Sequence, residues 1–115
     1  MPHCIIEYTR NLEPALDIQQ LVNVAFESIE KTDIFNRSAI KTRAIPLDYF
    51  KSGLDRDDYI HITVKILPGR TTEQKKILTQ SVIDGISAIV GRTKSLSVEV
   101  VDLDGDSYNK RISET

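Results

Sequence analysis

The chain has 115 residues, enough for one domain spanning 1–115, because two independent cores would leave each half below the size that usually folds alone. Apolar residues at 40% and charged residues at 28% exclude a disordered or fibrous chain. A net charge of -2 gives no overall attraction for nucleic acid or an anionic membrane. The sequence has no signal-peptide pattern and no apolar stretch long enough to cross a bilayer, so we expect a cytoplasmic protein.

The first elements in chain order are a strand and a helix. Residues 3–8 (HCIIEY) form an apolar, β-branched run that is typical of a strand. Asp17 and Gln20 have the spacing of a capping box, and an apolar stripe follows them, which predicts a helix over residues 17–31.

A second strand with charged side chains comes next. Residues 38–45 (SAIKTRAI) alternate in polarity, so we expect a strand that carries Lys41 and Arg43 on one face. Residues 46–58 contain Pro, Gly and a DRDD run without periodicity, and they predict an exposed connection.

The second half repeats this order. Residues 59–67 (YIHITVKIL) alternate as a half-buried strand does. Thr71 and Gln74 supply another capping box, which predicts a helix over residues 72–90 that stops at Gly91. The apolar side of this helix is expected to contain Ile77, Leu78, Val82, Ile86, Ile89 and Val90.

A closing strand is expected where Leu96, Val98 and Val100 alternate with polar residues, followed by a polar tail at residues 104–115. The order strand, helix, strand therefore occurs twice, in pseudo-repeats at about 2–46 and 59–103. Strands joined by a crossover helix pair in parallel, so each repeat is a βαβ unit. We predict an α+β fold in which a four-stranded mixed sheet carries two helices on one face.

The other face of this sheet has no covering layer within the chain. Alternating strands leave that face half polar, and 115 residues provide no third layer to place on it. We expect a homo-oligomer that buries this face between copies.

The Met1-Pro2 pair offers one candidate for chemistry. Proline has a small side chain that permits removal of the initiator methionine, which would leave a secondary amine at the start of the first strand. The alternative is an inert proline, because Pro is common at position two.

A cluster of cations offers a second candidate. Arg70 follows a Pro-Gly turn and precedes a capped helix, where backbone N–H groups and the helix dipole favour anions. Its guanidinium could take a carboxylate in a bidentate fashion, although an exposed turn residue would look the same. Lys41 and Arg43 add positive charge, with a salt-bridge role as the alternative.

Four further residues are weaker candidates. His3, His61 and Glu7 each lie in an alternating strand, where a structural role is the alternative to acid or base catalysis. Cys4 lies in an apolar run with nothing nearby in sequence that would lower the pKa of its thiol. The sequence contains no CxxC, HExxH or other metal-ligand spacing.

Three segments resemble the 5-carboxymethyl-2-hydroxymuconate isomerases, in the tautomerase superfamily that also holds 4-oxalocrotonate tautomerase and macrophage migration inhibitory factor. They are residues 1–7 (MPHCIIE), 32–43 (TDIFNRSAIKTR) and 61–71 (HITVKILPGRT), and the similarity runs over roughly residues 2–103. The resemblance implies a trimer that acts on a dicarboxylate or tricarboxylate in the catabolism of 4-hydroxyphenylacetate through homoprotocatechuate. It implies no cofactor and no metal.

Carried over residue by residue, Pro2 matches the catalytic base of that family and Arg70 matches its carboxylate-binding arginine. Where the family has an arginine in the segment aligned with residues 40–43, this chain has Lys41 and then Arg43. Lysine keeps the charge but lacks the planar fork, so the departure bears on substrate identity. For Pro2 to act as a base, burial and these cations must lower the pKa of its amine.

Two other functions stay open at this point. Another tautomerase-superfamily reaction, such as a keto-enol tautomerisation or a hydrolytic dehalogenation, would use the same residues. A non-catalytic oligomeric binding protein would keep the fold but would not need a free amine at Pro2. Whether Met1 is removed from the purified protein therefore distinguishes this function from the enzymatic ones.

Overall fold

The computed structural model describes residues 1–114, which form one four-stranded sheet and two α-helices. The elements in chain order are β1 (Pro2–Thr9), the 3-10 helix η1 (Arg10–Ala15), α1 (Ile18–Glu30), the 3-10 helix η2 (Arg37–Ala39), β2 (Lys41–Leu47), β3 (Tyr59–Ile66), α2 (Thr72–Ser87) and β4 (Ser95–Asp102). None of the helices in the described part of the chain is long and apolar enough to span a membrane.

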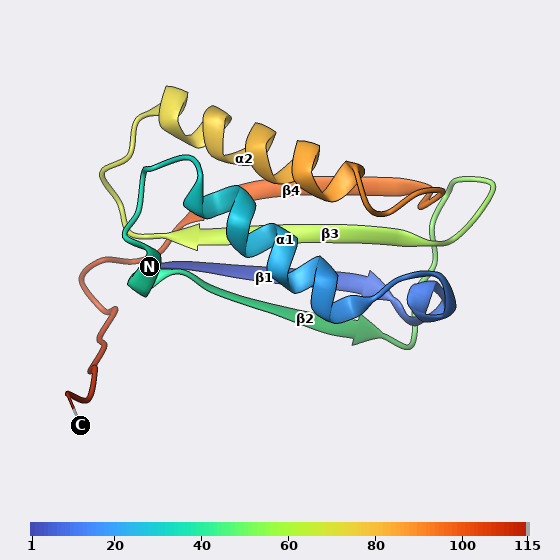
Figure 1. Cartoon of the computed structure of the whole chain (residues 1–115), viewed down its shortest axis with the longest axis horizontal. Helices are drawn as coiled ribbons and strands as arrows, with labels where there is room; N and C mark the ends of the chain where they lie inside the picture. Colours follow the sequence, from blue (N-terminus) through green and yellow to red (C-terminus); the bar gives the residue numbers. More distant parts are fainter. Residues whose placement is uncertain (115) are drawn as a thin grey trace.

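The sheet has the strand order β2-β1-β3-β4. β1 pairs in parallel with β2, β3 pairs in parallel with β4, and the two halves meet in an antiparallel pairing of β1 with β3. Both helices lie against the same face of the sheet and contact each other (Figure 1). The predicted α+β fold, a mixed sheet with two helices on one face, is therefore confirmed.

The core lies between the helices and the sheet, and strict alternation in β1 and β3 places it there. Along β3, Ile60, Ile62, Val64 and Ile66 are buried, while the residues between them are partly exposed. Along β1, Cys4, Ile6 and Tyr8 are likewise buried on the side of the helices. Burial of these large side chains against Leu21, Ile29, Leu78 and Ile86 of the helices supplies the main hydrophobic stabilisation.

Both helices begin at the predicted caps. Thr71 and Gln74 form the complete reciprocal capping box at the start of α2. Asp17 accepts a hydrogen bond from the backbone N–H of Gln20, which makes it an ordinary N-cap.

The second helix ends earlier than predicted. α2 stops at Ser87 instead of residue 90, and Ile89 and Val90 instead form a tight turn with bonds back to Ile86. Gly91 has a φ of +54°, the left-handed conformation that reverses the chain after this turn. The expectation that Ile77 lies on the buried side is also wrong, because its side chain is 49% exposed.

The second strand is shifted toward the C-terminus relative to its prediction over 38–45. Arg37–Ala39 form a 3-10 turn, and β2 runs from Lys41 to Leu47 through Pro46. Proline is compatible with this strand because β2 is at the edge of the sheet and pairs only with β1. The alternation itself is confirmed, since Lys41, Arg43 and Ile45 are exposed and the residues between them are partly buried.

The face of the sheet opposite the helices, here called the open face, is covered by no helix or strand within residues 1–114, and Tyr108 contacts only its edge at His3. It presents the alternate residues of each strand: His3, Ile5, Glu7, Lys41, Arg43, Ile45, His61, Thr63, Lys65, Ser97, Glu99 and Val101. Its charged and apolar side chains are intermixed, and Ile45 and Val101 are 43% and 39% exposed.

Candidate functional site

The site is built around the start of β1. The N-terminal amine of Met1 donates a hydrogen bond to the carbonyl of Ala39 at 2.8 Å, and the Met1 side chain is buried. Pro2, the next residue, is fully buried and pairs with Ile66 of β3. The beginning of the chain is therefore held inside the architecture of the sheet.

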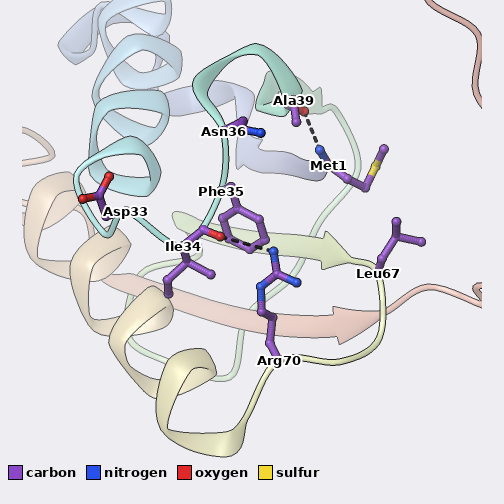
Figure 2. Close-up of a pocket in the computed structure, with 8 residues that line it drawn as sticks. All are labelled: Met1, Asp33, Ile34, Phe35, Asn36, Ala39, Leu67 and Arg70. Carbon is purple, nitrogen blue, oxygen red and sulfur yellow. Dashed lines mark hydrogen bonds between the residues drawn. The ribbon is translucent and has the colours of Figure 1, made fainter.

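A cavity of about 360 Å³ opens beside this amine. Its wall comes from the N-terminus, from the segment between α1 and β2, and from the turn between β3 and α2 (Figure 2). The lining residues are Met1, Asp33, Ile34, Phe35, Asn36, Ala39, Leu67 and Arg70. The cavity thus joins three chain segments that are distant in sequence.

Arg70 is held in place at the wall of the cavity. Its Nη2 donates to the carbonyl of Ile34 at 3.2 Å, and its guanidinium lies 4.8 Å from the centre of the Phe35 ring. Figure 2 shows this side chain extending from the turn before α2 toward Phe35. The guanidinium has five N–H donors, and these two contacts use one of them. The remaining N–H groups can therefore bind an anion.

The environment favours the neutral form of the N-terminal amine. The pKa of the Met1 amine is lowered from 8.0 to about 6, first by burial and then by the positive charges of Lys110, Lys41 and Arg70. Removal of Met1 would place the Pro2 nitrogen one residue further along the same strand, among the same cations. An amine in such a place can accept a proton near neutral pH.

Lys41 and Arg43 occupy different positions relative to this amine. Lys41 is paired with His3 in the strand register, and its charge acts on the amine. Arg43 is paired with Ile5, and its Nη1 lies 3.2 Å from His3 Nδ1. Neither side chain lines the cavity, and of the two predicted cations only Lys41 is among the charges that lower the pKa of the amine.

The weaker candidates have other surroundings. Glu7 lies five residues beyond Pro2, or about 16 Å along an extended strand. His61 contacts Ser97 Oγ at 2.6 Å and Glu99 Oε2 at 2.5 Å, opposite Glu7 in the register. Cys4 is fully buried, and burial raises the pKa of its thiol to about 12, which excludes a reactive thiolate.

Sequence reasoning missed one wall of the cavity and one segment that lies near the N-terminus. Phe35 and its neighbours form a wall of the cavity, although no periodicity or charge pattern marks them. The polar tail comes back to the N-terminus, where Lys110 acts on the amine and the Tyr108 hydroxyl lies 3.2 Å from His3 Nε2. In the sequence, Lys110 and Tyr108 are the only signals that could have indicated a role for that tail. Within residues 1–114 no group of three or more His, Cys, Asp or Glu side chains is placed to hold a metal ion.

Comparison with known proteins agrees with this geometry. The 5-carboxymethyl-2-hydroxymuconate Delta-isomerase of Escherichia coli is 27% identical over 110 residues, covering 90% of this chain and 87% of that protein. The crystal structure of a 5-carboxymethyl-2-hydroxymuconate isomerase from Deinococcus radiodurans R1 is 26% identical with a TM-score of 0.81, covering 97% of this chain and 90% of that one.

More distant structures share the fold. The symmetric trimer of wild-type fused 4-OT has a TM-score of 0.68 at 14% identity, covering 88% of this chain and 85% of that one.

The family model of 5-carboxymethyl-2-hydroxymuconate isomerase matches residues 2–111. The chain therefore belongs to the 5-carboxymethyl-2-hydroxymuconate isomerase family, and it is an enzyme of the isomerase and tautomerase type.

Proposed function

We propose that the protein isomerises an unsaturated 2-hydroxy dicarboxylate or tricarboxylate, such as 5-carboxymethyl-2-hydroxymuconate, with the amine of Pro2 as the base. The observation that carries this proposal is that the start of the chain and Arg70 line the same cavity, next to the nitrogen that removal of Met1 would free at Pro2. The lowered pKa of the Met1 amine supports it, since it shows the effect of burial and nearby cations at this end of β1. Family membership supports the reaction type, and the cations support an anionic substrate. A place in aromatic catabolism and in the cytoplasm follows from the same proposal.

The reaction moves one proton and leaves the atom count unchanged. The neutral nitrogen of Pro2 removes the proton of the substrate enol, and the O–H electron pair forms the C=O bond as the conjugated double bonds shift. The protonated amine then returns the same proton to a carbon of the dienolate. The base must be uncharged to begin, and the burial and cations that favour the neutral Met1 amine should favour a neutral Pro2 amine once Met1 is removed.

Arg70 and the two cations of β2 have separate roles in this proposal. Arg70 binds a carboxylate of the substrate, because Ile34 and Phe35 hold its guanidinium at the cavity wall. Lys41 and Arg43 supply positive charge that stabilises the dienolate. Lysine in place of an arginine leaves the charge but removes the bidentate geometry, so Lys41→Arg should be tolerated or should improve binding.

The active form is proposed to be a homotrimer. The open face is half polar and lacks a covering element within residues 1–114, and it includes two apolar side chains that are about two-fifths exposed. The fused 4-OT of the same fold forms a symmetric trimer. Packing three open faces together would bury them.

The test compares three forms of the protein whose N-terminus is verified by mass. Turnover of 5-carboxymethyl-2-hydroxymuconate should be highest for the form that begins at Pro2. Pro2→Ala should be slower but active, since processing leaves a primary amine in about the same place. A form that retains Met1 should lose nearly all activity, because the Pro2 nitrogen is then an amide without basicity and the Met1 amine, one residue away from that position, is bound to the carbonyl of Ala39.

The order of the three rates decides the matter. Equal rates with and without Met1 would place the base elsewhere, with His3 and then Glu7 as the next candidates. The same assay with smaller 2-hydroxydienoates and phenylpyruvate-type enols tests the proposed substrate class. If the enzyme turns these over faster than the muconate, the proposed substrate class is wrong.

A further inference from the structure

A second cavity, of about 260 Å³, lies at the end of the sheet that is far from the N-terminus. Its wall comes from three segments, which are η1 with Leu16 after it, the residues that precede β3, and the turn between α2 and β4. These segments lie together where β1 ends and β3 begins (Figure 1). The second cavity shares no lining residue with the cavity beside Met1, so it is separate from the site described above.

The two βαβ repeats relate this cavity to the first one. The first cavity is lined by the residue before β1, the segment between α1 and β2, and the turn between β3 and α2. The second cavity is lined by residues before β3, the segment between α2 and β4, and the segment between β1 and α1. Exchanging one repeat for the other converts the first description into the second. The antiparallel pairing of β1 with β3 then puts the two cavities at opposite ends of the sheet.

The two cavities differ in the residue that precedes the central strand. Met1 brings a terminal amine to the first cavity, whereas Asp58, in the middle of the chain, brings a carboxylate to the second. The backbone nitrogen of Asp58 is an amide and has no basicity. The second cavity can therefore bind a ligand, but it lacks the terminal amine that proton transfer at the first site needs.

The floor of the second cavity, formed by Leu12, Leu16 and Val90, is apolar. Leu12 and Val90 are buried in the hydrophobic core, and Leu16 packs against that core. Because the core lies between the helices and the sheet, the cavity is on the helix side and not on the open face. Packing of copies through their open faces would leave it accessible.

Arg56 is held in place at this cavity. Its Nε donates to Asp58 Oδ1 at 3.1 Å, and its Nη2 donates to the carbonyl of Arg92. The other oxygen of Asp58 accepts a hydrogen bond from the backbone N–H of Lys94 at 2.8 Å, which fixes the carboxylate. These contacts use two of the five N–H donors of the guanidinium, so the others can bind an anion.

The balance of charge in the second cavity favours an anion. Asp58 is paired with Arg56, so these two charges compensate each other. Arg92 also lines the cavity and is exposed, and within residues 1–114 no carboxylate lies within ion-pair distance of it. One positive charge is therefore left beside an apolar floor, which suits a carboxylate with an apolar chain.

We propose that the second cavity binds a small organic carboxylate, with the carboxylate on the two arginines and the apolar chain on the floor. The site is separate from that of the proposed reaction, and it needs neither turnover nor removal of Met1. Its volume lies just below the usual range of ligand pockets, which begins at about 300 Å³, so the ligand is small.

The test follows both cavities at once, by NMR of the full chain titrated with hexanoate. The backbone amides of Leu16 and Val90 report on the second cavity, and those of Phe35 and Leu67 report on the first. Hexanoate should shift the Leu16 and Val90 signals in a saturable way. Signals that do not move, or that do not saturate, would overturn the proposal.

Arg92→Gln removes the uncompensated charge but keeps a polar side chain. It should weaken hexanoate binding at the second cavity about tenfold and change the affinity at the first cavity less than twofold. Arg111→Gln is the matched control, because Arg111 is an exposed arginine that lines neither cavity, and it should change neither affinity. A change under twofold at the second cavity for Arg92→Gln would overturn the role of this arginine.

The chemistry of the ligand tests the arginines and the floor separately. Hexanamide has the chain without the charge, while acetate and inorganic phosphate have a charge without the chain. Each of the three should bind the second cavity at least about tenfold more weakly than hexanoate does. Equal binding of hexanamide would exclude an ion pair with the arginines, and equal binding of acetate or phosphate would exclude the apolar contact; either result overturns the proposed ligand class.

Sedimentation of Arg92→Gln checks whether the cavity is a contact between copies. The variant should sediment as the unaltered protein does. A change in oligomeric state would show that the turn after α2 contacts another copy of the chain, and it would overturn a site for a small molecule. None of these measurements involves turnover, so their outcome does not depend on whether the proposed reaction is correct.

Discussion

At the scale of single residues, the site depends on how the segment between α1 and β2 holds Arg70. The guanidinium is fixed by the carbonyl of Ile34 and the ring of Phe35, so its remaining N–H groups are oriented before a ligand arrives. A preoriented fork loses little conformational freedom on binding a carboxylate.

Arg70→Ala should therefore lower kcat/KM for the muconate by about two decades or more, which is a few kcal/mol of lost transition-state stabilisation. Arg37→Ala is a suitable control, because Arg37 is an exposed arginine whose ion pair is with Glu30 on α1. A change under threefold for Arg70→Ala would show that it is only a turn residue.

The amine makes a prediction about pH. Burial and cations lower the pKa of the Met1 amine, and after removal of Met1 they should lower the pKa of the Pro2 amine in the same way, so kcat/KM should rise with pH through that lowered pKa and then level off. The rate follows the neutral fraction of the free enzyme, which increases as the solution becomes more basic. A titration of ¹⁵N-proline-labelled Met-free enzyme by NMR gives the same pKa directly, and a rate that falls over this range would contradict the amine as base.

At the scale of elements, the two helices meet at a close contact. Gly85 of α2 faces Ser28 of α1, and a Cβ at Gly85 would lie 2.1 Å from Ser28 Oγ and 3.3 Å from Ser28 Cβ. Ser28 is buried and its hydroxyl is on a short side chain, so the helices would have to separate.

Gly85→Ala tests this contact. Alanine would favour the helix by about 1 kcal/mol, but the overlap should cost about 1–3 kcal/mol, so that unfolding in urea should show a net loss of stability. Adding Ser28→Ala removes the atom at 2.1 Å and should recover most of the loss. A stabilised Gly85→Ala variant would show that the helices adjust freely.

At the scale of the whole molecule, the open face governs assembly. Sedimentation equilibrium should give three times the chain mass of 13.0 kDa. Val101→Asp, on the open face, should weaken the assembly, while Ile77→Asp, on the outer side of α2, should leave it intact. A stable monomer at micromolar concentration would exclude the trimer.

The sequence by itself determined the elements and the layers of this fold. Alternation in β1 and β3 and the caps at Asp17 and Thr71 depend on neighbours a few residues away, so they are visible in a linear pattern. Edge positions are not visible in that way, which is why β2 extends through Pro46 where the sequence predicts a loop.

Only the tertiary structure decided how the site is assembled. Pro2 and Arg70 could be identified from the sequence by their resemblance to a family, but Phe35 by itself carries no periodicity or charge that distinguishes it from an ordinary side chain. It lines the cavity with Met1 and Arg70 because the antiparallel pairing of β1 with β3 brings the start of the chain beside the turn before α2. Contacts between such distant segments depend on the folded arrangement of all four strands, and no short stretch of sequence contains that information.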